Sequence, residues 1–490
     1  MNRAERLARL LRVLAAIIAE PGLNPLELAE RAGVSERTLR RDLAQLRELG
    51  YEVAYTSGYE VQERLNLEGR SKQRQRSRGD DALLQAVAQA VESAGLWRET
   101  ERVESTAPRR PKPRRSGKTP ILLIPAGDED ADFIYATGLA VEKALYIRFA
   151  EGDDVLVTSP LEADRARTLA KVASVVEDRV VYVDDSWAAL AARMLRQRGI
   201  GDARVSANLP AVYLEDLLAE GIDARVDREL FVRERRHKSA EEAEAIADAQ
   251  RAAESAVVEV VRELARAEIR DGMLWTNGDL LTSEKLYARA QQVLGERGYT
   301  CPDMIIAGSP ECALPHYRGT GPIRANAPVI IDIFPTSRTT HFSGDLTRTV
   351  VVGEASEEVR RMHAAVLQAL DAGTESIAAG VPCEEPHHAV CQVLVDRGYA
   401  TTTTGFEGAE GAAKLNHSTG HGVGLEIHEL PSIKDSHKQP LEEGDVVTVE
   451  PGLYLIGFGG VRVEDTGMVV SNGFQNFTTL TRSLNPQDYL

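Results

Sequence analysis

A carboxylate stands inside one of the most apolar runs of this 490-residue chain. Asp332 lies within residues 329–334, VIIDIF, where a charged side chain is costly unless a cation or hydrogen bonds stabilise it. Thirteen residues later comes Asp345, in the run 344–350, which we interpret as the return strand. A hairpin of this kind would bring both carboxylates to one face. The chain must therefore fold so that these two charges gain a partner.

The same arrangement recurs later in the sequence. Glu450 lies in the run VVTVEPGLYL, and Glu464 follows fourteen residues later in GGVRVEDTGMVV. Between the two hairpins lie His417, His421 and His428. Each of these residues alone is more often structural than functional. Four carboxylates and one imidazole converging on a site would hold two divalent cations, which can lower the pKa of a bridging water and polarise a carbonyl oxygen.

Several segments carry a family resemblance: ALPHYRGTG, IDIF, GDLTRTVV, HSTGHGVGLEIHE, VEPGLY and GGVRVEDTG. They closely resemble the pita-bread metallopeptidases, in the branch of Xaa-Pro aminopeptidases and prolidases. The resemblance covers about residues 119–490. It implies an α+β chain, with a pita-bread catalytic domain preceded by a smaller α/β, creatinase-like domain. It also implies an exopeptidase that hydrolyses the Xaa-Pro bond of proline-containing peptides.

The same resemblance implies the site residues. The metal ligands would be Asp332, Asp345, His421, Glu450 and Glu464, with Asp345 and Glu464 bridging two ions. We expect Mn²⁺, with Co²⁺ and Zn²⁺ as alternatives that suit the same donors. The catalytic residues would be His316, His417 and His428 around the substrate, Glu450 as proton relay, and Arg462 in support of the metal cluster.

The sequence departs from the family between its two aspartates. The family more often separates them by eleven residues, so this hairpin is two residues longer, through Thr339, Thr340 and His341. We expect the departure to alter the rim of the site and not its ligands. His387 and His388 match no motif and are interpreted as surface residues. Creatinase shares the fold without using metals, but all five ligand positions are present here, which favours a working metal site.

The N-terminal segment ELAERAGVSERTLRRDLAQLRELGY looks like the winged helix-turn-helix of bacterial repressors. Helical spacing predicts helices over about residues 7–18, 25–31 and 35–49, followed by a hairpin of 51–55 with 59–61. By this likeness Ser35 begins the recognition helix, and Arg37, Thr38, Arg40 and Arg41 contact double-stranded DNA. The alternative is a winged helix used for protein contacts.

Charge and composition divide the chain into four parts. Residues 1–118 hold 23 Lys and Arg against 17 Asp and Glu, a net charge of +6, whereas the remainder carries −23 of the total of −17. We predict a winged helix-turn-helix domain at 1–66, a basic linker at 67–118, the creatinase-like domain at 119–236 and the catalytic domain at 237–490. A capping box of Ser239 and Glu242 opens a long helix that we expect to end near Ile269.

Local patterns predict the elements of the creatinase-like domain. The runs ILLIP, KALYIRF, DDVLVTS and DRVVYVD read as strands, and residues 164–175 and 187–197 as helices. The longest early apolar run, residues 13–19, is too short to span a bilayer. The four cysteines, which form no CxxC pair, read as reduced structural thiols. We therefore expect a cytoplasmic protein without a membrane segment, and a homodimer, because members of the family commonly pair.

Two functions stay open at this point. The chain is either a two-metal exopeptidase fused to a DNA-binding domain, or a transcriptional regulator whose peptidase-like domain senses a peptide or a metal without turnover. The ligand set does not separate them, because a sensor could retain its metals.

Overall fold

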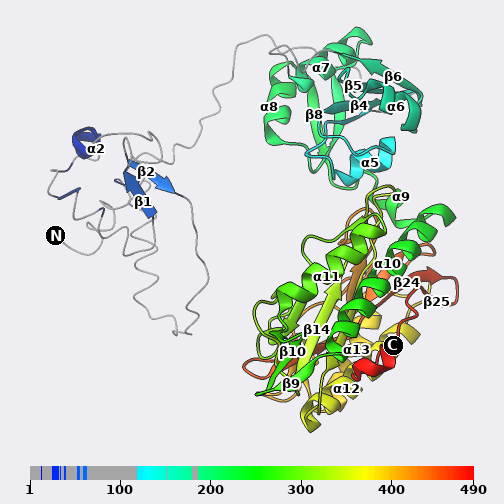
Figure 1. Ribbon diagram of the computed structural model, residues 1–490. Coiled ribbons are helices and arrows are strands. Elements are labelled where there is room, and N and C mark those ends of the chain that lie inside the picture. The colour runs from blue at the N-terminus through cyan, green and yellow to red at the C-terminus, as the bar shows by residue number, and fades with distance from the viewer. Residues whose placement is uncertain are drawn as a thin grey trace. The chain divides into compact units, whose positions relative to one another are not determined.

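Figure 1 shows the computed structural model of the chain, which divides into two compact units, Met1–Pro111 and Lys112–Leu490. Within the second unit the structure describes residues 119–150, 152–178 and 186–490. Within the first it describes Val13, residues 25–31, Val34, Thr38, Leu39 and Leu43, and the backbone of residues 52–55 and 59–62.

The first unit contains two of the predicted elements. Helix α2 spans Pro25–Arg31, and strand β1 (Glu52–Tyr55) pairs antiparallel with β2 (Tyr59–Gln62), so the second helix and the hairpin are confirmed. Thr38 is helical and half-buried. The helices predicted over about 7–18 and 35–49 lie largely outside the described residues, as do Ser35, Arg37, Arg40, Arg41 and the whole of 67–118.

A six-stranded mixed sheet forms the first part of the second unit, in the order β6-β5-β4-β3-β7-β8. Its strands are β3 (Ile121–Leu123), β4 (Ala144–Arg148), β5 (Asp154–Thr158), β6 (Ser174–Glu177), β7 (Asp202–Ser206) and β8 (Asp223–Asp227). Helices α5 (Ala131–Thr137), α6 (Ala163–Leu169), α7 (Trp187–Gln197) and α8 (Ala211–Ala219) accompany it. Two apolar clusters, one built around Leu145 and Leu195 and one around Phe133 and Tyr146, form its core.

One predicted helix of this domain is too long. The expected helix over residues 164–175 ends at Leu169, and residues from Ser174 onward form β6, which pairs in parallel with β5. Hydrogen bonding to a neighbouring strand overrides the local helical pattern there. The predicted helix at 187–197 is confirmed as α7, and residues 179–184 of the run DRVVYVD lie outside the described residues.

Helix α10 (Ala240–Ala265) follows the short α9 (Val232–Arg236) and begins at the predicted capping box. Ser239 Oγ accepts from the Glu242 backbone, and the Glu242 carboxylate accepts from the Ser239 backbone. The predicted end near Ile269 is wrong. Residues Glu268–Arg270 form β9, which turns through Asp271 and Gly272, both at positive φ, to pair with β10 (Met273–Thr276).

Three sheets build the part of the chain that carries the candidate site. The first is β13 (Ile305–Gly308), β14 (Pro328–Ile333) and β16 (Leu346–Val351); the second is β20 (Glu429–Ile433), β19 (Gly420–Gly422), β21 (Val446–Val449), β24 (Asp465–Val470) and β25 (Gly473–Asn476); the third is β17 (Ala400–Thr401), β18 (Lys414–Leu415), β22 (Gly452–Leu455) and β23 (Gly459–Arg462). Smaller elements are β11 (Asp279–Leu280), β12 (Tyr299–Thr300), β15 (Thr336–Ser337) and the 3-10 turns η2 (Glu311–Ala313) and η3 (Pro486–Tyr489).

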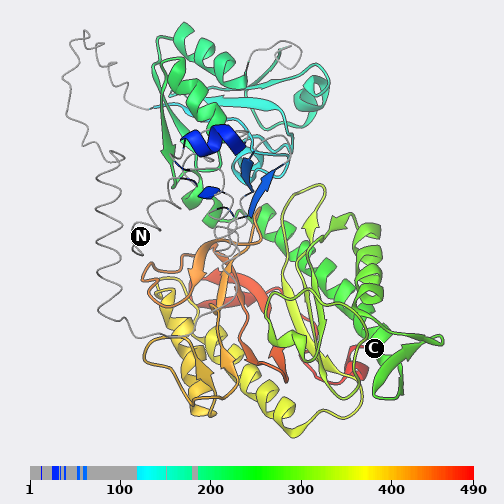
Figure 2. The same ribbon diagram turned by 90° about the vertical axis from the view of Figure 1, so that its left-hand side faces the viewer.

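Two helix pairs cover these sheets, as Figures 1 and 2 show. Helices α10 and α11 (Ser283–Glu296) share an apolar core with β14 and β16, and α12 (Glu357–Glu375) and α13 (Glu384–Asp396) share another with β21–β24. Helix α10 lies close to the residues that precede β16: a Cβ added at Gly344 would come within 2.6 Å of the Ala249 backbone. Among the described residues, no helix is both long and apolar enough to cross a membrane.

Candidate metal centre

The five predicted ligands lie at the ends of paired strands. Asp332 lies on β14, opposite Thr347 of β16. Asp345 directly precedes β16. Glu450 follows β21 and Glu464 precedes β24. The residues next to them, Val449 and Asp465, are paired across the two strands. His421 lies on β19, between β20 and β21. The five side chains line one cavity of about 800 Å³.

The donor atoms approach one another closely. His421 Nε2 lies 3.6 Å from Asp345 Oδ2 and 3.5 Å from Glu450 Oε1. Asp345, His421 and Glu464 each offer a ligand atom, and these atoms all lie within 4.8 Å of one another. Asp332 Oδ1 is buried without a hydrogen-bond partner. Such an orphaned acceptor is rare in a folded protein, so the cluster fits a bound divalent cation.

Burial among like charges shifts the acids of this cluster. Desolvation, reinforced by neighbouring carboxylates, raises the pKa of Asp345 and of Glu464 well above the ordinary range, and it raises that of Glu450 to about 8. Burial and the nearby His428 lower the pKa of His421 to about 4. The imidazole is therefore neutral near pH 7, the form that binds metals. A cation would relieve the repulsion among the acids.

Arg462 connects the acids to a histidine on the cavity wall. Its Nη2 donates to Asp332 Oδ2 at 2.6 Å, and its Nη1 donates to the Tyr454 hydroxyl at 2.8 Å. His417 Nε2 lies 2.9 Å from the same hydroxyl, and its Nδ1 lies 2.7 Å from the Ser418 carbonyl. Because a carbonyl only accepts, Nδ1 carries the proton and Nε2 accepts from Tyr454. Burial and Arg462 lower the pKa of His417 to about 3.

The other two predicted histidines lie on the rim. His316 and His428 are exposed and line the same cavity. The His428 ring lies 4.2 Å from the His421 ring between centroids, and burial lowers the His428 pKa. The structure thus brings all eight predicted residues of the metal and histidine sets, with Arg462, to one cavity.

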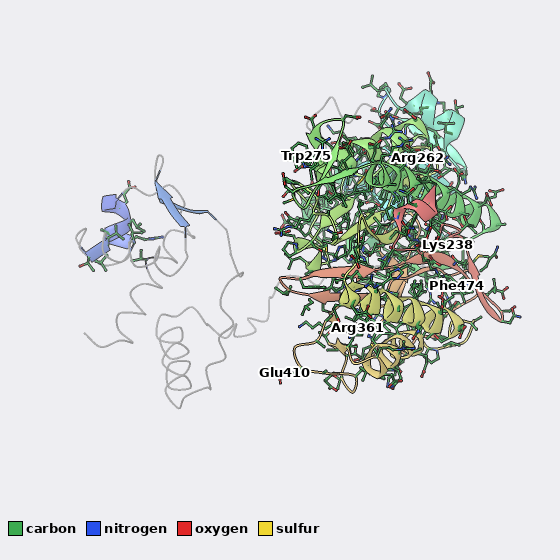
Figure 3. All side chains as sticks on the ribbon, turned by 60° about the horizontal axis from the view of Figure 1, so that its bottom comes forward. Lys238, Arg262, Trp275, Arg361, Glu410 and Phe474 are labelled. Atoms are coloured by element: carbon green, nitrogen blue, oxygen red, sulfur yellow. The ribbon has the colours of Figure 1, made fainter. Side chains whose placement is uncertain are left out.

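Ion pairs hold the start of β20, which directly follows His428. Glu429 lines the cavity, and its carboxylate pairs with Lys238 Nζ at 2.5 Å and Arg235 Nη2 at 2.7 Å. Arg235 Nη1 also reaches Asp132 of α5, at 3.1 Å. Lys238 is labelled in Figure 3. Arg235 of α9 therefore connects the cavity wall to the six-stranded domain.

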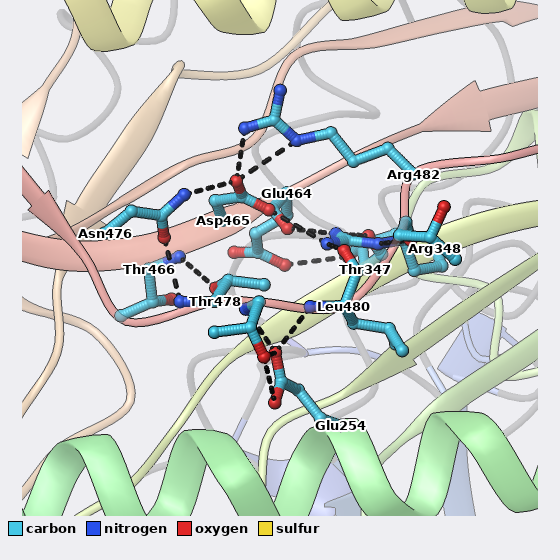
Figure 4. Close-up of polar contacts among 12 residues, drawn as sticks. Glu254, Thr347, Arg348, Glu464, Asp465, Thr466, Asn476, Thr478, Leu480 and Arg482 are labelled. Atoms are coloured by element: carbon cyan, nitrogen blue, oxygen red, sulfur yellow. Dashed lines mark hydrogen bonds and ion pairs between the residues drawn. The ribbon is translucent and has the colours of Figure 1, made fainter. Parts of the chain in front are cut away.

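Hydrogen bonds from neighbouring residues hold two of the acids in place. Gln250 of α10 accepts from the Asp345 N–H at 2.9 Å and donates to the Asp345 carbonyl at 2.8 Å. Thr347 donates to Glu464 Oε2 at 2.8 Å. Arg348 is fully buried, with Nη2 3.0 Å from Asp465 Oδ1, as Figure 4 shows. These contacts fix two of the acids through their own backbones and neighbours.

Sequence reasoning missed several of these supporting residues. Gln250 falls on the apolar stripe of its helix, at i+4 from Ile246, and a lone polar residue there was an available signal. Tyr454 lies within VEPGLY and Arg348 within GDLTRTVV. Their partners His417 and Asp465 are 37 and 117 residues away, which no local pattern indicates.

The interpretation of His387 as a surface residue is wrong. It is 2% exposed and contacts two threonines, because α13 turns this face toward the sheet. His388 is half-buried and lies 3.1 Å from Asp435. His341 is half-buried with φ of 62° and is not among the residues that line the cavity. All four cysteines are buried and free, as expected for structural thiols.

Comparison with known proteins gives two family matches: metallopeptidase family M24 over residues 244–471 and HTH domain over residues 9–60. The chain is 27% identical over 355 residues to the Xaa-Pro dipeptidase of Pyrococcus horikoshii, covering 71% of this chain and 91% of the relative. The crystal structure of the prolidase from that organism matches at 26% identity and a TM-score of 0.62, covering 75% of this chain and 95% of that one. An Xaa-Pro dipeptidase from Bacillus anthracis matches at 25% identity and 0.64, covering 75% and 94%. The expected fold class is confirmed.

Proposed function

We propose that this chain, a metal-dependent hydrolase of metallopeptidase family M24, cleaves the Xaa-Pro bond of peptides with two bound divalent ions. The observation that carries the proposal is the convergence of four carboxylates and one neutral imidazole on a single cavity, with a buried Asp332 oxygen left without a partner. The similar proteins named Xaa-Pro dipeptidase and prolidase support the substrate class.

In this proposal Asp332, Asp345, His421, Glu450 and Glu464 would hold the two ions, and Asp345 and Glu464 would be the acids shared by both. When bound, such ions would lower the pKa of a water and polarise the carbonyl that is attacked. Glu450 holds the proton taken from that water and releases it to the prolyl nitrogen. His316 and His428, on the rim, contact the peptide and orient it. Arg462 holds the Asp332 carboxylate in place through its bond to Oδ2.

Purified full-length protein, stripped with a chelator and reloaded, tests this function. Reloading with Mn²⁺, Co²⁺ or Zn²⁺ in turn shows which metal supports turnover, with Mn²⁺ expected to be the most effective. The substrates are Ala-Pro and Ala-Pro-Gly, and the matched control is Ala-Ala. We expect hydrolysis of the proline peptides only. Tight binding of Mn²⁺ with no hydrolysis would instead support a regulator that senses a metal or peptide.

We also propose that the N-terminal region binds double-stranded DNA, and that the protein acts in the cytoplasm as a homodimer. The match of residues 9–60 to the HTH domain family supports the first part, as does the basic charge of residues 1–118. In this proposal Ser35 begins the recognition helix and Arg37, Thr38, Arg40 and Arg41 contact DNA.

A further inference from the structure

A buried histidine outside the proposed catalytic set contacts Thr419, which lies between His417 and His421 in the sequence. His387, on α13, is 2% exposed. Its Nδ1 lies 2.9 Å from Thr419 Oγ1, and its Nε2 lies 2.8 Å from Thr403 Oγ1. Both ring nitrogens are thus hydrogen-bonded to hydroxyl groups, which can donate or accept. A buried side chain with both polar atoms satisfied holds one orientation.

His387 stays neutral in the folded protein. Burial, with the nearby His388, lowers its pKa to about 4. A neutral imidazole has one donor and one acceptor nitrogen, so one threonine hydroxyl donates to the ring and the other accepts. The ring therefore links α13 to two separate segments without any charge.

Thr419 lies two residues from each of the two histidines and is itself fully buried. Its N–H donates to the Ile433 carbonyl at 3.0 Å, and its own carbonyl accepts from the Glu450 N–H at 2.7 Å. Through this one residue, the strand that carries His421 is joined to β20 and to the residue that follows β21. Its side chain has one described hydrogen-bond partner, His387.

The strands around Thr419 have no free space. A Cβ added at Gly420 would lie 2.0 Å from the Thr448 carbonyl oxygen, and one added at Gly422 would lie 2.5 Å from that of Leu430. A shift of Thr419 therefore cannot be absorbed locally. It displaces His421 and Glu450, because close-packed interiors transmit strain.

We infer that His387 is a positioning residue that, through its Nδ1 contact with Thr419, holds His421 and Glu450 at the separation required for metal binding and turnover. The kinetic part of this inference rests on the proposed peptidase function. The metal-binding part does not require turnover.

Two substitutions of His387 separate its two contacts. The amide of Asn lies at about the position of Nδ1, so His387→Asn can keep the bond to Thr419, whereas the longer His387→Gln reaches the position of Nε2 and Thr403. Thr419→Val deletes the hydroxyl without changing the side chain's shape, and Thr403→Val is the matched control on the other side of the ring.

We expect His387→Gln and Thr419→Val to lower kcat on Ala-Pro about 10- to 100-fold and to weaken Mn²⁺ binding by a similar factor, as loss of groups that orient metal ligands does. KM should change less than about threefold, because the rim residues that contact the peptide are untouched. His387→Asn and Thr403→Val should keep kcat and Mn²⁺ affinity within about threefold of wild type, even where their Tm falls. The double variant His387→Gln/Thr419→Val should be no worse than either single one.

Two outcomes would overturn the inference. One is equal loss of kcat in Thr403→Val and Thr419→Val in proportion to their loss of Tm, which would make the role one of general stability. The other is wild-type Mn²⁺ affinity, by calorimetry on chelator-stripped protein, in folded Thr419→Val. If wild-type protein binds Mn²⁺ but hydrolyses nothing, the proposed function fails and the affinity series still decides the positioning role. If wild type binds no Mn²⁺, both fail.

Discussion

At the residue scale, the buried acids of the site differ in what their carboxylates contact. Asp332 has one oxygen bound to Arg462 and the other without a partner, whereas Asp345 and Glu464 face mainly other acids. Burying a carboxylate without a partner costs free energy. Among the described residues that line the cavity, Arg462 is the one buried arginine. The arrangement is stable when a cation supplies the missing charge.

Comparing substitutions of the two proposed bridging acids with one of His428 should distinguish residues that bind metal from a residue that contacts the substrate. We expect Asp345→Asn and Glu464→Gln each to lower Ala-Pro hydrolysis by at least about 100-fold and to reduce bound metal, since each removes a charge from the cluster. His428→Ala should keep its metal while kcat falls about 10- to 100-fold. Elemental analysis beside kinetics measures both.

A matched control for this series is Asp279→Asn, because the Asp279 side chain is 80% exposed and is not among the residues that line the cavity. It should retain both metal and rate. Near-wild-type turnover in Asp345→Asn or Glu464→Gln would rule out the two-metal proposal.

The buried His387 predicts how stability depends on pH. Its pKa is lowered from 6.5 to about 4, so the unfolded chain binds a proton between these values that the folded chain does not. Stability is therefore full above pH 6.5 and falls as pH drops from 6.5 toward 4, by up to about 3 kcal/mol. With the metal removed, lowering the pH from 7.5 to 4.5 should reduce the Tm of wild type by about 5 °C more than that of His387→Leu. Equal Tm losses in the two proteins would contradict a neutral buried His387.

At the element scale, strand β16 is joined to β24 and to the C-terminal segment by one guanidinium. Arg348 is fully buried, pairs with Asp465 at 3.0 Å and donates to the carbonyls of Thr481 and Leu480, each at 2.7 Å. Asp465 is shared with Arg482, as Figure 4 shows. These partners lie more than a hundred residues from Arg348 in the sequence, so the arginine fixes β16 relative to β24 and the C-terminal segment.

Arg348→Met should destabilise this part of the chain by about 3 kcal/mol, because it leaves Asp465 Oδ1 and several buried carbonyls without their donor, although Arg482 still pairs with Asp465 Oδ2. Chemical denaturation of the metal-free protein, followed by tryptophan fluorescence, measures this. The control is Arg361→Met on α12, whose side chain is 63% exposed and is labelled in Figure 3. It should change stability by less than about 0.5 kcal/mol. An equal effect of both substitutions would show that burial of the ion pair is not what stabilises this region.

At the scale of the whole molecule, the proposed metal ligands all lie after residue 330, whereas the HTH match ends at residue 60. The two proposed activities therefore draw on separate parts of the sequence. Residues 1–118 carry a net charge of +6 and the remainder −23. The positive charge of the N-terminal part favours binding of a polyanion such as DNA, whereas the negative charge of the remainder does not. A homodimer would present two helix-turn-helix units to a two-fold site, with half-sites about 34 Å apart or a multiple of it.

Arg40→Ala and Arg41→Ala in the full chain should weaken binding to promoter DNA while leaving Ala-Pro hydrolysis unchanged. The reason is that they remove groove or phosphate contacts and touch no ligand of the metal centre. Electrophoretic shift in a salt series should also show binding falling steeply as salt rises, because phosphate contacts release counterions. Failure of the full chain to bind DNA at low salt would assign the N-terminal region to protein contacts.

The sequence by itself determined the elements and residues whose signals are local. Helical spacing of apolar residues placed α7 at residues 187–197, the capping box placed the start of α10, and charges inside apolar runs marked the acids that line one cavity. Each signal depends on backbone and side-chain preferences within a few residues, so it can be read without knowing what lies opposite.

The tertiary structure alone decided the features that depend on distant partners. The end of α10 and the start of β6 were set by pairing with β10 and β5, against the helical pattern of their own residues. His387 was decided by which face of α13 packs on the sheet, and its contact with Thr419 joins positions 32 residues apart. Hydrogen bonds and burial between segments far apart in the chain leave no periodic trace in either segment, which is why only the folded molecule reveals them.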